Sequence, residues 1–206
     1  MAGIFITFEG GDGAGKSTQV GRLAERLREK GYTVVTTREP GGTELGAEIR
    51  KALLHGGEVS PRAEALLFAA DRAHHVASKI RPALAAGKVV ISDRYLDSSV
   101  AYQGAARSLD KDEVLSLSLW AVEGLLPQLT VLLDVPVAQS AGRVGDTPDR
   151  LESEGLDFHA RVREEFLALA AAQPERFLVL NGRDTIENIA DQVWAAVENL
   201  LAKVDL

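Results

Sequence analysis

The chain has 206 residues, of which 46% are hydrophobic and 26% are charged, and its formal net charge is −7 at pH 7. This composition is typical of one folded α/β domain and excludes an extended disordered chain. The acidic balance disfavours a nucleic-acid polymer or an anionic membrane as the main partner, and the lack of cysteine excludes disulfides, thiolate nucleophiles and cysteine-based zinc sites.

The sequence has no features of a leader or a membrane anchor. Its N-terminus lacks the basic stretch of a signal peptide and runs directly into an apolar segment. No run of about 18 apolar residues occurs without a charge or a glycine. We therefore expect a cytoplasmic protein with no membrane partner.

Five short apolar runs alternate with longer helical patterns along the chain. Because each run is apolar on both faces, the runs are typical of parallel strands covered by helices. They lie at residues 4–8, 33–37, 89–92, 130–134 and 177–180. The intervening segments are long enough for crossover helices, so the pattern predicts an α/β fold with a five-stranded parallel sheet flanked by helices on both faces.

Helix boundaries are marked around the middle of the chain. Ser60 and Pro61 form an N-cap and first-turn pair, and Gly87 closes the segment that follows. Pro82 should kink or end this helix near residues 80–81, because proline lacks the amide donor and clashes with the preceding turn.

A last amphipathic helix is predicted at about residues 186–203, where apolar side chains recur at helical spacing. The sequence contains no internal repeat, low-complexity tract or linker-like change in composition. These observations predict a single domain over residues 1–206.

The segment GGDGAGKS at residues 10–17 matches G-x-x-x-x-G-K-[ST] at every fixed position, between a predicted strand and a predicted helix at 16–30. Glycines let backbone amides point at a phosphate, and the helix N-terminus adds a positive dipole end. In this motif Lys16 reaches the outer phosphates, and the Ser17 hydroxyl completes a Mg²⁺ shell. The sequence therefore predicts a nucleoside triphosphate, taken as ATP, together with Mg²⁺. The residues expected around it are Gly10, Gly11, Asp12, Gly13, Ala14, Gly15, Lys16, Ser17 and Thr18.

A second segment with phosphate chemistry follows the third predicted strand. Asp93 ends this strand at the carboxyl edge of the sheet, where open α/β folds bind their ligands. An aspartate in this position orients Mg²⁺ or its waters, and the alternative is that it caps the next helix. Arg94 offers a guanidinium fork for a second phosphate.

Several further blocks narrow the range of functions. FEG leads into the loop, and TREPGG at 37–42, LFAADR at 67–72 and DRY-x-x-S-x-x-AYQ at 93–103 follow in order. With these blocks the sequence resembles the bacterial thymidylate kinases, nucleoside monophosphate kinases with the P-loop NTPase fold, along essentially its whole length. A guanine-reading N-K-x-D motif, which a regulatory GTPase would normally carry, does not occur.

The resemblance implies transfer of the γ-phosphoryl group of ATP to dTMP, giving dTDP and ADP in dTTP synthesis. It also implies a homodimer, for which the apolar segment 114–126 with Trp120 is compatible, as it is with plain core. A different nucleoside or nucleotide kinase is the nearest alternative. A nucleotide-dependent switch that binds a partner is the alternative from another class.

Phe68 and Arg72 are four residues apart and should share one face of their helix. The ring can stack on a base, and the guanidinium can donate to O4 of thymine, where cytosine presents an amine. The alternative is a core phenylalanine and a solvated arginine. The resemblance implies substrate contacts by Arg38, Glu39, Phe68, Arg72, Arg94, Ser99, Tyr102 and Gln103.

The resemblance also implies individual roles in this set. Arg38 and Arg94 would hold the 5′-phosphate of dTMP, Tyr102 would crowd the 2′ position of the sugar, and Gln103 would help to position the base. Asp12 would lie near the 3′-hydroxyl, and its alternative is a turn-forming residue before the next glycine. For Glu39 the alternative is a salt bridge with the adjacent Arg38.

Phosphoryl transfer to a phosphate dianion needs alignment and positive charge rather than a strong general base. His74 and His75 are therefore expected to be structural or solvent-facing. The loop contains no arginine, and in this the sequence resembles those thymidylate kinases that supply one from a lid. The resemblance implies a lid at about residues 142–154 with either Arg143 or Arg150 as the catalytic arginine. The predicted catalytic residues are Lys16, Asp12, Arg94, Arg143 and Arg150.

Overall fold

The computed structural model describes residues 3–107, 109–140 and 149–203 of the chain. Its sheet has five strands in the order β2-β3-β1-β4-β5, and every neighbouring pair is parallel. The strands are β1 Ile4–Glu9, β2 Val34–Arg38, β3 Val89–Asp93, β4 Leu129–Asp134 and β5 Phe177–Asn181. The predicted fold class is confirmed, and each strand begins and ends within one residue of its expected position.

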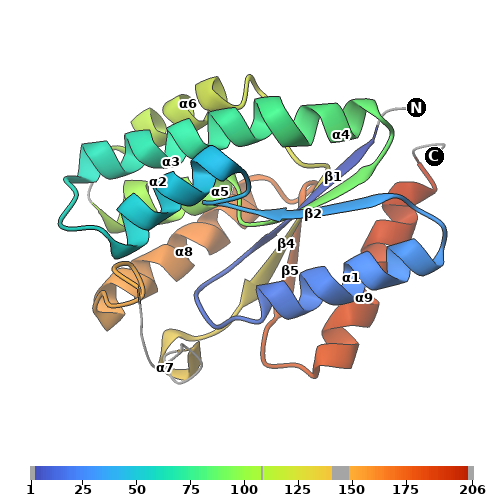
Figure 1. The fold of residues 1–206 in the computed structure, drawn as a ribbon. Helices are drawn as coiled ribbons and strands as arrows, with labels where there is room; N and C mark the ends of the chain where they lie inside the picture. Colours follow the sequence, from blue (N-terminus) through green and yellow to red (C-terminus); the bar gives the residue numbers. More distant parts are fainter. Residues whose placement is uncertain (1–2, 108, 141–148, 204–206) are drawn as a thin grey trace.

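Helices cover both faces of this sheet, with α1 and α9 on one face and α3, α4 and α6 on the other (Figure 1). The α-helices are α1 Lys16–Glu29, α2 Glu44–His55, α3 Pro61–His75, α4 Arg81–Ala85, α5 Leu96–Ser99, α6 Lys111–Ala121, α7 Val137–Ser140, α8 Leu156–Ala172 and α9 Ile186–Leu201. Two π-helical segments are η1 Val76–Ile80 and η2 Val100–Ala106. Within the described ranges, no helix combines the length and apolarity that crossing a membrane requires.

The central strand β1 is buried on both sides because its side chains alternate between the two helical layers. Ile4, Ile6 and Phe8 belong to the core formed with α1 and α9. Phe5 belongs to the core on the opposite face, with η1 and α4. The edge strands β2 and β5 are only partly covered and contain exposed residues, among them Val179, so the expectation of two buried faces is wrong for these two strands.

Pro82 lies within a continuous run of helix. α3 passes into η1, which leads directly into α4 with Pro82 in its first turn. The wider π-helical turn before the proline accommodates the missing amide donor, so the helix changes type near residues 80–81 and does not end there. Gly87, with a φ of 72°, terminates the run two residues after α4.

A buried ion pair fixes α5 to the sheet. Arg176, directly before β5, donates to both carboxylate oxygens of Asp97 at 2.8 Å. The same guanidinium donates to the Thr130 hydroxyl at 2.7 Å. Because both charged side chains are almost fully buried, each requires the other for compensation. This pair therefore positions the short helix that carries Ser98 and Ser99 above the sheet.

Candidate active site

The loop between β1 and α1 crosses the carboxyl end of the sheet. Gly10 has a φ of 134°, and Gly15, the N-cap residue of α1, has a φ of 95°, conformations that side chains disfavour. A Cβ atom on Gly10 would also lie 2.5 Å from the Leu133 carbonyl oxygen. Glycine at these positions lets the chain turn closely around the end of the strand.

Lys16 is buried inside this loop. Its Nζ donates to the carbonyl oxygens of Gly10 at 3.0 Å and Gly11 at 2.7 Å. Burial, together with the nearby Arg94, lowers the pKa of the amine to about 8. In the described part of the chain these two carbonyl groups hold the amine, and Lys16 lines the loop cavity, where an anion could contact it.

Ser17 and Asp93 meet because β1 and β3 are neighbours. The Ser17 hydroxyl donates to Oδ2 of Asp93 at 2.7 Å. The N-cap residue of α5 is Tyr95, so the alternative role of Asp93 as a helix cap is wrong. One hydroxyl and one carboxylate fit Mg²⁺, which takes few protein ligands and completes its shell with water and phosphate oxygens. A cage of three or more acidic or histidine side chains is absent from the part of the chain that the structure describes.

Arg94 links the loop to the region under α3. Its Nη1 donates to the Gly10 carbonyl at 3.1 Å and to the Ser98 hydroxyl at 3.0 Å. Its Nη2 donates to Asp12 and, at 3.1 Å, to the Tyr102 hydroxyl. The backbone of Arg94 has a φ of 69°, a strained value for a residue other than glycine. The surrounding contacts therefore hold this side chain in one direction.

Asp12 points inward from the loop. Burial alone would raise the pKa of its carboxyl group, but Arg94 and Lys16 lower it well below the usual range, so the group is ionised. The Tyr102 hydroxyl donates to its Oδ2 at 2.9 Å. Asp12 is therefore bonded to two residues outside the loop and does more than form a turn.

Glu9 supports this arrangement from below, and the sequence analysis assigned it no role. It is fully buried and accepts hydrogen bonds from the Tyr95 amide at 2.8 Å and the Ser98 hydroxyl at 2.6 Å. Burial and the nearby Asp97 raise the pKa of Glu9 to about 8. Through Ser98, this carboxyl group helps to fix Arg94.

Two cavities meet at Arg94. The loop cavity has about 960 Å³ of empty space and is lined by Asp12, Gly13, Gly15, Lys16, Ser17, Thr18, Arg38, Glu39, Arg50, Asp93, Arg94 and Glu152. The inner cavity has about 570 Å³ and is lined by Asp12, Glu39, Pro40, Arg50, Leu54, Phe68, Arg72, Arg94, Tyr95, Ser98, Ser99, Tyr102, Gln103, Asp149, Leu151 and Glu152. Of the predicted loop residues, Gly10, Gly11 and Ala14 do not line the loop cavity. The two cavities share Asp12 and Arg94, so they form one continuous site.

Two further arginines face this site. Arg38 is exposed at the end of β2, and among the described residues its side chain has no hydrogen-bond or ion-pair partner. Arg50 on α2 lines both cavities and donates to the Pro40 carbonyl at 3.0 Å. Burial and the nearby Arg38 lower its pKa. The sequence analysis missed Arg50, although its spacing from the apolar Leu53 and Leu54 indicated the inward face of the helix.

Phe68 and Arg72 lie together on α3, and both line the inner cavity. Arg72 is only 1% exposed, so the alternative of a solvated arginine is wrong. Its two terminal nitrogens donate to the Ser99 hydroxyl, each at 3.1 Å. Phe68 also packs in a core cluster with Leu54, so it is at once core and cavity wall.

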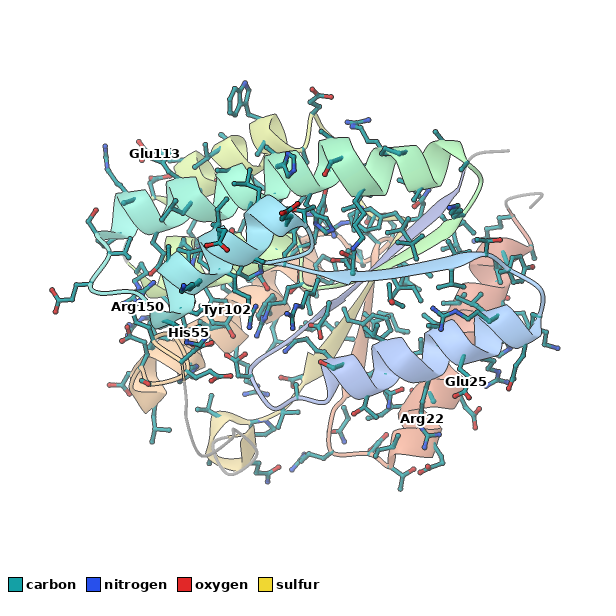
Figure 2. All side chains as sticks on the ribbon, in the orientation of Figure 1. Arg22, Glu25, His55, Tyr102, Glu113 and Arg150 are labelled. Carbon is teal, nitrogen blue, oxygen red and sulfur yellow. The ribbon has the colours of Figure 1, made fainter. Side chains whose placement is uncertain are left out.

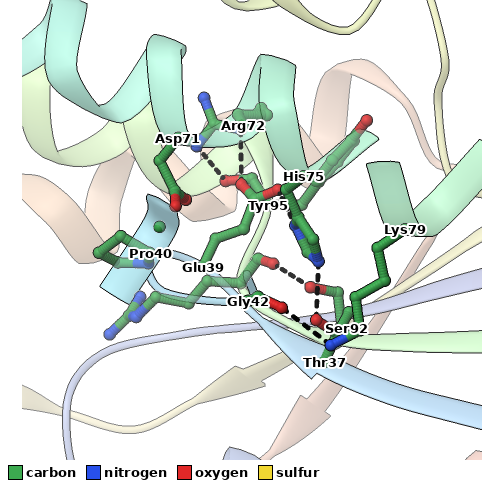
Figure 3. A network of polar contacts seen from close by, with 12 residues as sticks. Thr37, Glu39, Pro40, Gly42, Asp71, Arg72, His75, Lys79, Ser92 and Tyr95 are labelled. Atoms are coloured by element: carbon green, nitrogen blue, oxygen red, sulfur yellow. Dashed lines mark hydrogen bonds and ion pairs between the residues drawn. The ribbon is translucent and has the colours of Figure 1, made fainter. Parts of the chain in front are cut away.

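Glu39 organises a buried polar network beside Arg72 (Figure 3). Arg72 Nε donates to one Glu39 oxygen at 2.7 Å, and His75 Nδ1 pairs with the other at 2.8 Å. The second ring nitrogen of His75 lies 2.7 Å from the Thr37 hydroxyl. The network ties the end of β2 to α3.

This network decides two of the alternatives. Glu39 pairs with Arg72 and His75 and makes no salt bridge with Arg38, so that alternative is wrong. His75 is buried and structural, whereas His74 is exposed. The turn after Glu39 closes tightly over the histidine, since a Cβ atom on Gly42 would lie 2.6 Å from His75 Nε2.

Gln103 and Arg150 meet at Glu64. Gln103 lines the inner cavity and donates to Glu64 at 3.0 Å. Arg150 donates to Glu64 and, through Nε, to the Leu53 carbonyl at 2.9 Å. Arg150 and Tyr102 both lie near the convergence of α2, α3 and α8 (Figure 2). Arg150 lines neither cavity, and Arg143, with the rest of 142–148, lies outside the described residues.

A phosphate loop at the carboxyl edge of a parallel sheet, opening into a second cavity rich in arginine, defines a P-loop phosphotransferase with room for a second phosphorylated ligand. A family model described as thymidylate kinase matches residues 8–193. The chain belongs to the thymidylate kinase family.

Individual proteins show the same similarity. A thymidylate kinase of Clavibacter sepedonicus is 59% identical over 206 residues, covering 98% of each chain. A thymidylate kinase of Leifsonia xyli subsp. xyli is 60% identical, covering 93% of this chain and 92% of its own. The crystal structure of a thymidylate kinase from Ehrlichia chaffeensis superposes with a TM-score of 0.80 at 33% identity, covering 96% and 99% of the two chains.

The lowered pKa of Lys16 predicts pH-dependent ATP binding. The amine is protonated below its pKa of about 8 and loses its charge above it, so the affinity for ATP should fall as pH rises through 8. We expect the Kd measured by calorimetry at constant Mg²⁺ to rise about tenfold from pH 7 to pH 9. Lys16→Met should bind weakly at every pH, and a flat wild-type profile would contradict the prediction.

Proposed function

We propose that this protein transfers the γ-phosphoryl group of ATP to dTMP, giving dTDP and ADP, as a step in dTTP synthesis. The observation that carries this proposal is the junction of the two cavities at Arg94 and Asp12. A triphosphate held by the loop would point its outer phosphate at this junction, and a nucleotide in the inner cavity would place its own phosphate there. Membership of the thymidylate kinase family supports the choice of donor and acceptor.

On the donor side, the loop amides and Lys16 would hold the phosphates of ATP. Ser17 and Asp93 would hold Mg²⁺, which supplies positive charge to the phosphate oxygens when bound. The Lys16 amine exchanges its two carbonyl partners for phosphate oxygens, which are stronger acceptors. The binding free energy of the donor therefore includes the release of Lys16 from the loop carbonyls.

On the acceptor side, Phe68 would stack on the base, and Arg72 would donate to O4 of thymine from its rigid frame of Glu39 and Ser99. The base would therefore contact the buried ring of Phe68 and a guanidinium donor of Arg72 that is held in one position. Stacking supplies affinity, and the donor selects a carbonyl at position 4 of the ring.

Around the acceptor phosphate, Arg94, Arg38 and Arg50 would supply positive charge at the junction of the cavities. Tyr102 and Asp12 are hydrogen-bonded to each other and to Arg94, which supports a position for both at the sugar, between base and phosphate. Because Arg94 touches both the loop and the inner cavity, it is suited to align the two phosphates.

No side chain needs to act as a strong base, because the acceptor is a phosphate dianion. We propose that residues 142–154 form the lid of the single domain and that Arg143 or Arg150 completes the charge around the moving group. The contact of Arg150 with Glu64 favours a supporting role for Arg150 on the acceptor side.

An acceptor panel tests the proposed reaction. With ATP and Mg²⁺, release of ADP should be fastest with dTMP, slower with dUMP, and slower by at least about 10²-fold with dCMP or thymidine. In dCMP the donor and acceptor groups of the base edge are reversed, and thymidine lacks the phosphate. A coupled assay with each acceptor measures kcat/KM. A preference for dCMP or thymidine would reject the substrate assignment, and slow hydrolysis that ignores every acceptor would favour the switch.

Arg94→Met should lower kcat/KM for dTMP by about 10²–10³-fold, because it removes a fixed cation from the junction of the two phosphates. Arg94→Lys keeps the charge but loses the fork, so its value should lie between those of the wild type and Arg94→Met. Steady-state kinetics measure both variants. Arg22→Met, at an exposed ion pair on α1, is the matched control and should behave as wild type. Equal kinetics for Arg94→Met and the control would remove Arg94 from the mechanism.

We also propose that the chain forms a homodimer through α3 and α6. Trp120 on α6 is 79% exposed and Leu66 on α3 is 57% exposed, although both are large apolar side chains. A hollow of about 760 Å³ lies beside Trp120, lined also by Ala73, Val76 and Ala77. An apolar surface of this kind is typical of a protein–protein interface.

Trp120→Glu should place a charge in this interface and shift the chain to the monomer. Sedimentation equilibrium would then give about 22 kDa, against twice this mass for the wild type. Leu156→Glu, at an exposed apolar residue on α8, is the matched control and should leave the dimer intact. A monomeric wild type would contradict the proposal. The cytoplasmic location stays a prediction.

A further inference from the structure

Glu64 on α3 is a fully buried carboxylate, and among the described residues three side chains are its partners. Gln103 Nε2 donates to its Oε1 at 3.0 Å, and Arg107 Nε lies 3.4 Å from the same oxygen. Arg150 donates to the other oxygen. Arg107 and Arg150 thus compensate the buried charge, and the third partner is the uncharged amide of Gln103.

The carboxylate decides which way round the Gln103 amide lies. A carboxylate only accepts hydrogen bonds, so the NH₂ group of the glutamine must face Glu64. The amide oxygen then points to the opposite side, and within the described ranges no group donates to it. Since Gln103 lines the inner cavity and is 1% exposed, this oxygen is an acceptor offered to whatever fills the cavity.

The orientation of the Gln103 amide therefore determines one of the two groups with which the cavity would recognise a base. Arg72 lines the cavity, and its Nη1 retains one N–H beyond the hydrogen bond to Ser99, whereas Gln103 presents an acceptor. The edge of thymine carries a carbonyl acceptor at position 4 next to an N–H donor at position 3, which complements this pair. Cytosine carries an amine donor and an unprotonated nitrogen at the same positions, so it matches neither group. An amide turned the other way would lose this discrimination.

We propose that Glu64 is a specificity-determining positioning residue, which fixes the Gln103 amide so that the cavity accepts a base with an N–H donor beside a carbonyl. This inference rests on the proposed function, since it names how the acceptor cavity selects dTMP. Glu64 itself does not line the cavity and acts only through Gln103. Arg150 and Arg107 hold the carboxylate in place, so both arginines contribute indirectly to base selection.

Glu64→Gln tests the proposal, because a neutral amide at position 64 can accept or donate and no longer dictates the orientation of Gln103. We expect the ratio of kcat/KM for dTMP to that for dCMP to fall about tenfold or more. The change should appear in KM and in the Kd of each monophosphate measured by calorimetry. An unchanged ratio in the folded variant overturns the proposal.

A double-mutant cycle separates this role from a merely structural one. Gln103→Leu removes the amide and should by itself reduce the ratio. If Glu64 acts through Gln103, adding Glu64→Gln to Gln103→Leu should change the ratio no further. A full additional loss in the double variant means that Glu64 acts by another route and overturns the proposal.

Glu165→Gln is the matched control, because Glu165 on α8 is also a buried carboxylate paired with a cation, Lys111, but does not contact Gln103 or Arg72. It should lower the stability of the fold and keep the ratio, whereas a ratio reduced as much as in Glu64→Gln would overturn the proposal. If Glu64→Gln fails to fold, Glu64→Asp carries the test, since it retains the charge but withdraws the acceptor from the amide. Its ratio should fall, and an unchanged value overturns the proposal. A wild-type enzyme that does not use dTMP would reject the proposed function, which is a separate outcome.

Discussion

The hydrogen bonds of one guanidinium group hold the functional end of this molecule together. Arg94 follows β3 in a strained backbone conformation. Its guanidinium donates to the phosphate loop, to Ser98 on α5 and to the hydroxyl of Tyr102, which lines the inner cavity. These contacts join the loop cavity to the inner cavity, and the linings of both cavities include Arg94. With these contacts, the positions of Asp12 and Tyr102 follow from that of Arg94. The strain is retained because many contacts specify the same geometry.

The support beneath Arg94 consists of buried polar groups, among which Asp97 and Arg176 form an ion pair. Glu9 accepts a hydrogen bond from Ser98, and the neighbouring Asp97 is neutralised by Arg176, directly before β5. Such groups are costly to bury, and their contribution is a defined arrangement rather than net stability. The same logic applies beneath Arg72, where Glu39 is shared with His75. Arg72 is thus held by a buried carboxylate directly, and Arg94 is connected to one through Ser98.

The sequence was sufficient for the fold and for the loop because both depend on local patterns. Apolar runs mark parallel strands, and the glycines of residues 10–17 mark a backbone shape. The partner of Glu39 could not be found in this way. Arg38 is its neighbour in sequence, but successive residues at a strand end point to opposite sides, so Glu39 turns inward to Arg72 while Arg38 faces the loop cavity. Arg50 was missed for a related reason, since only the packing of α2 brings it to the site.

Base recognition also requires a glycine at position 42, because the turn after Glu39 passes close to His75. Gly42 lies outside both cavities, yet any side chain there would collide with the imidazole that steadies Glu39. Tolerance to substitution at this position is therefore governed by space and not by chemistry. A map of which amino acids the chain accepts should show as strict a requirement at this silent glycine as at the arginine that faces the base.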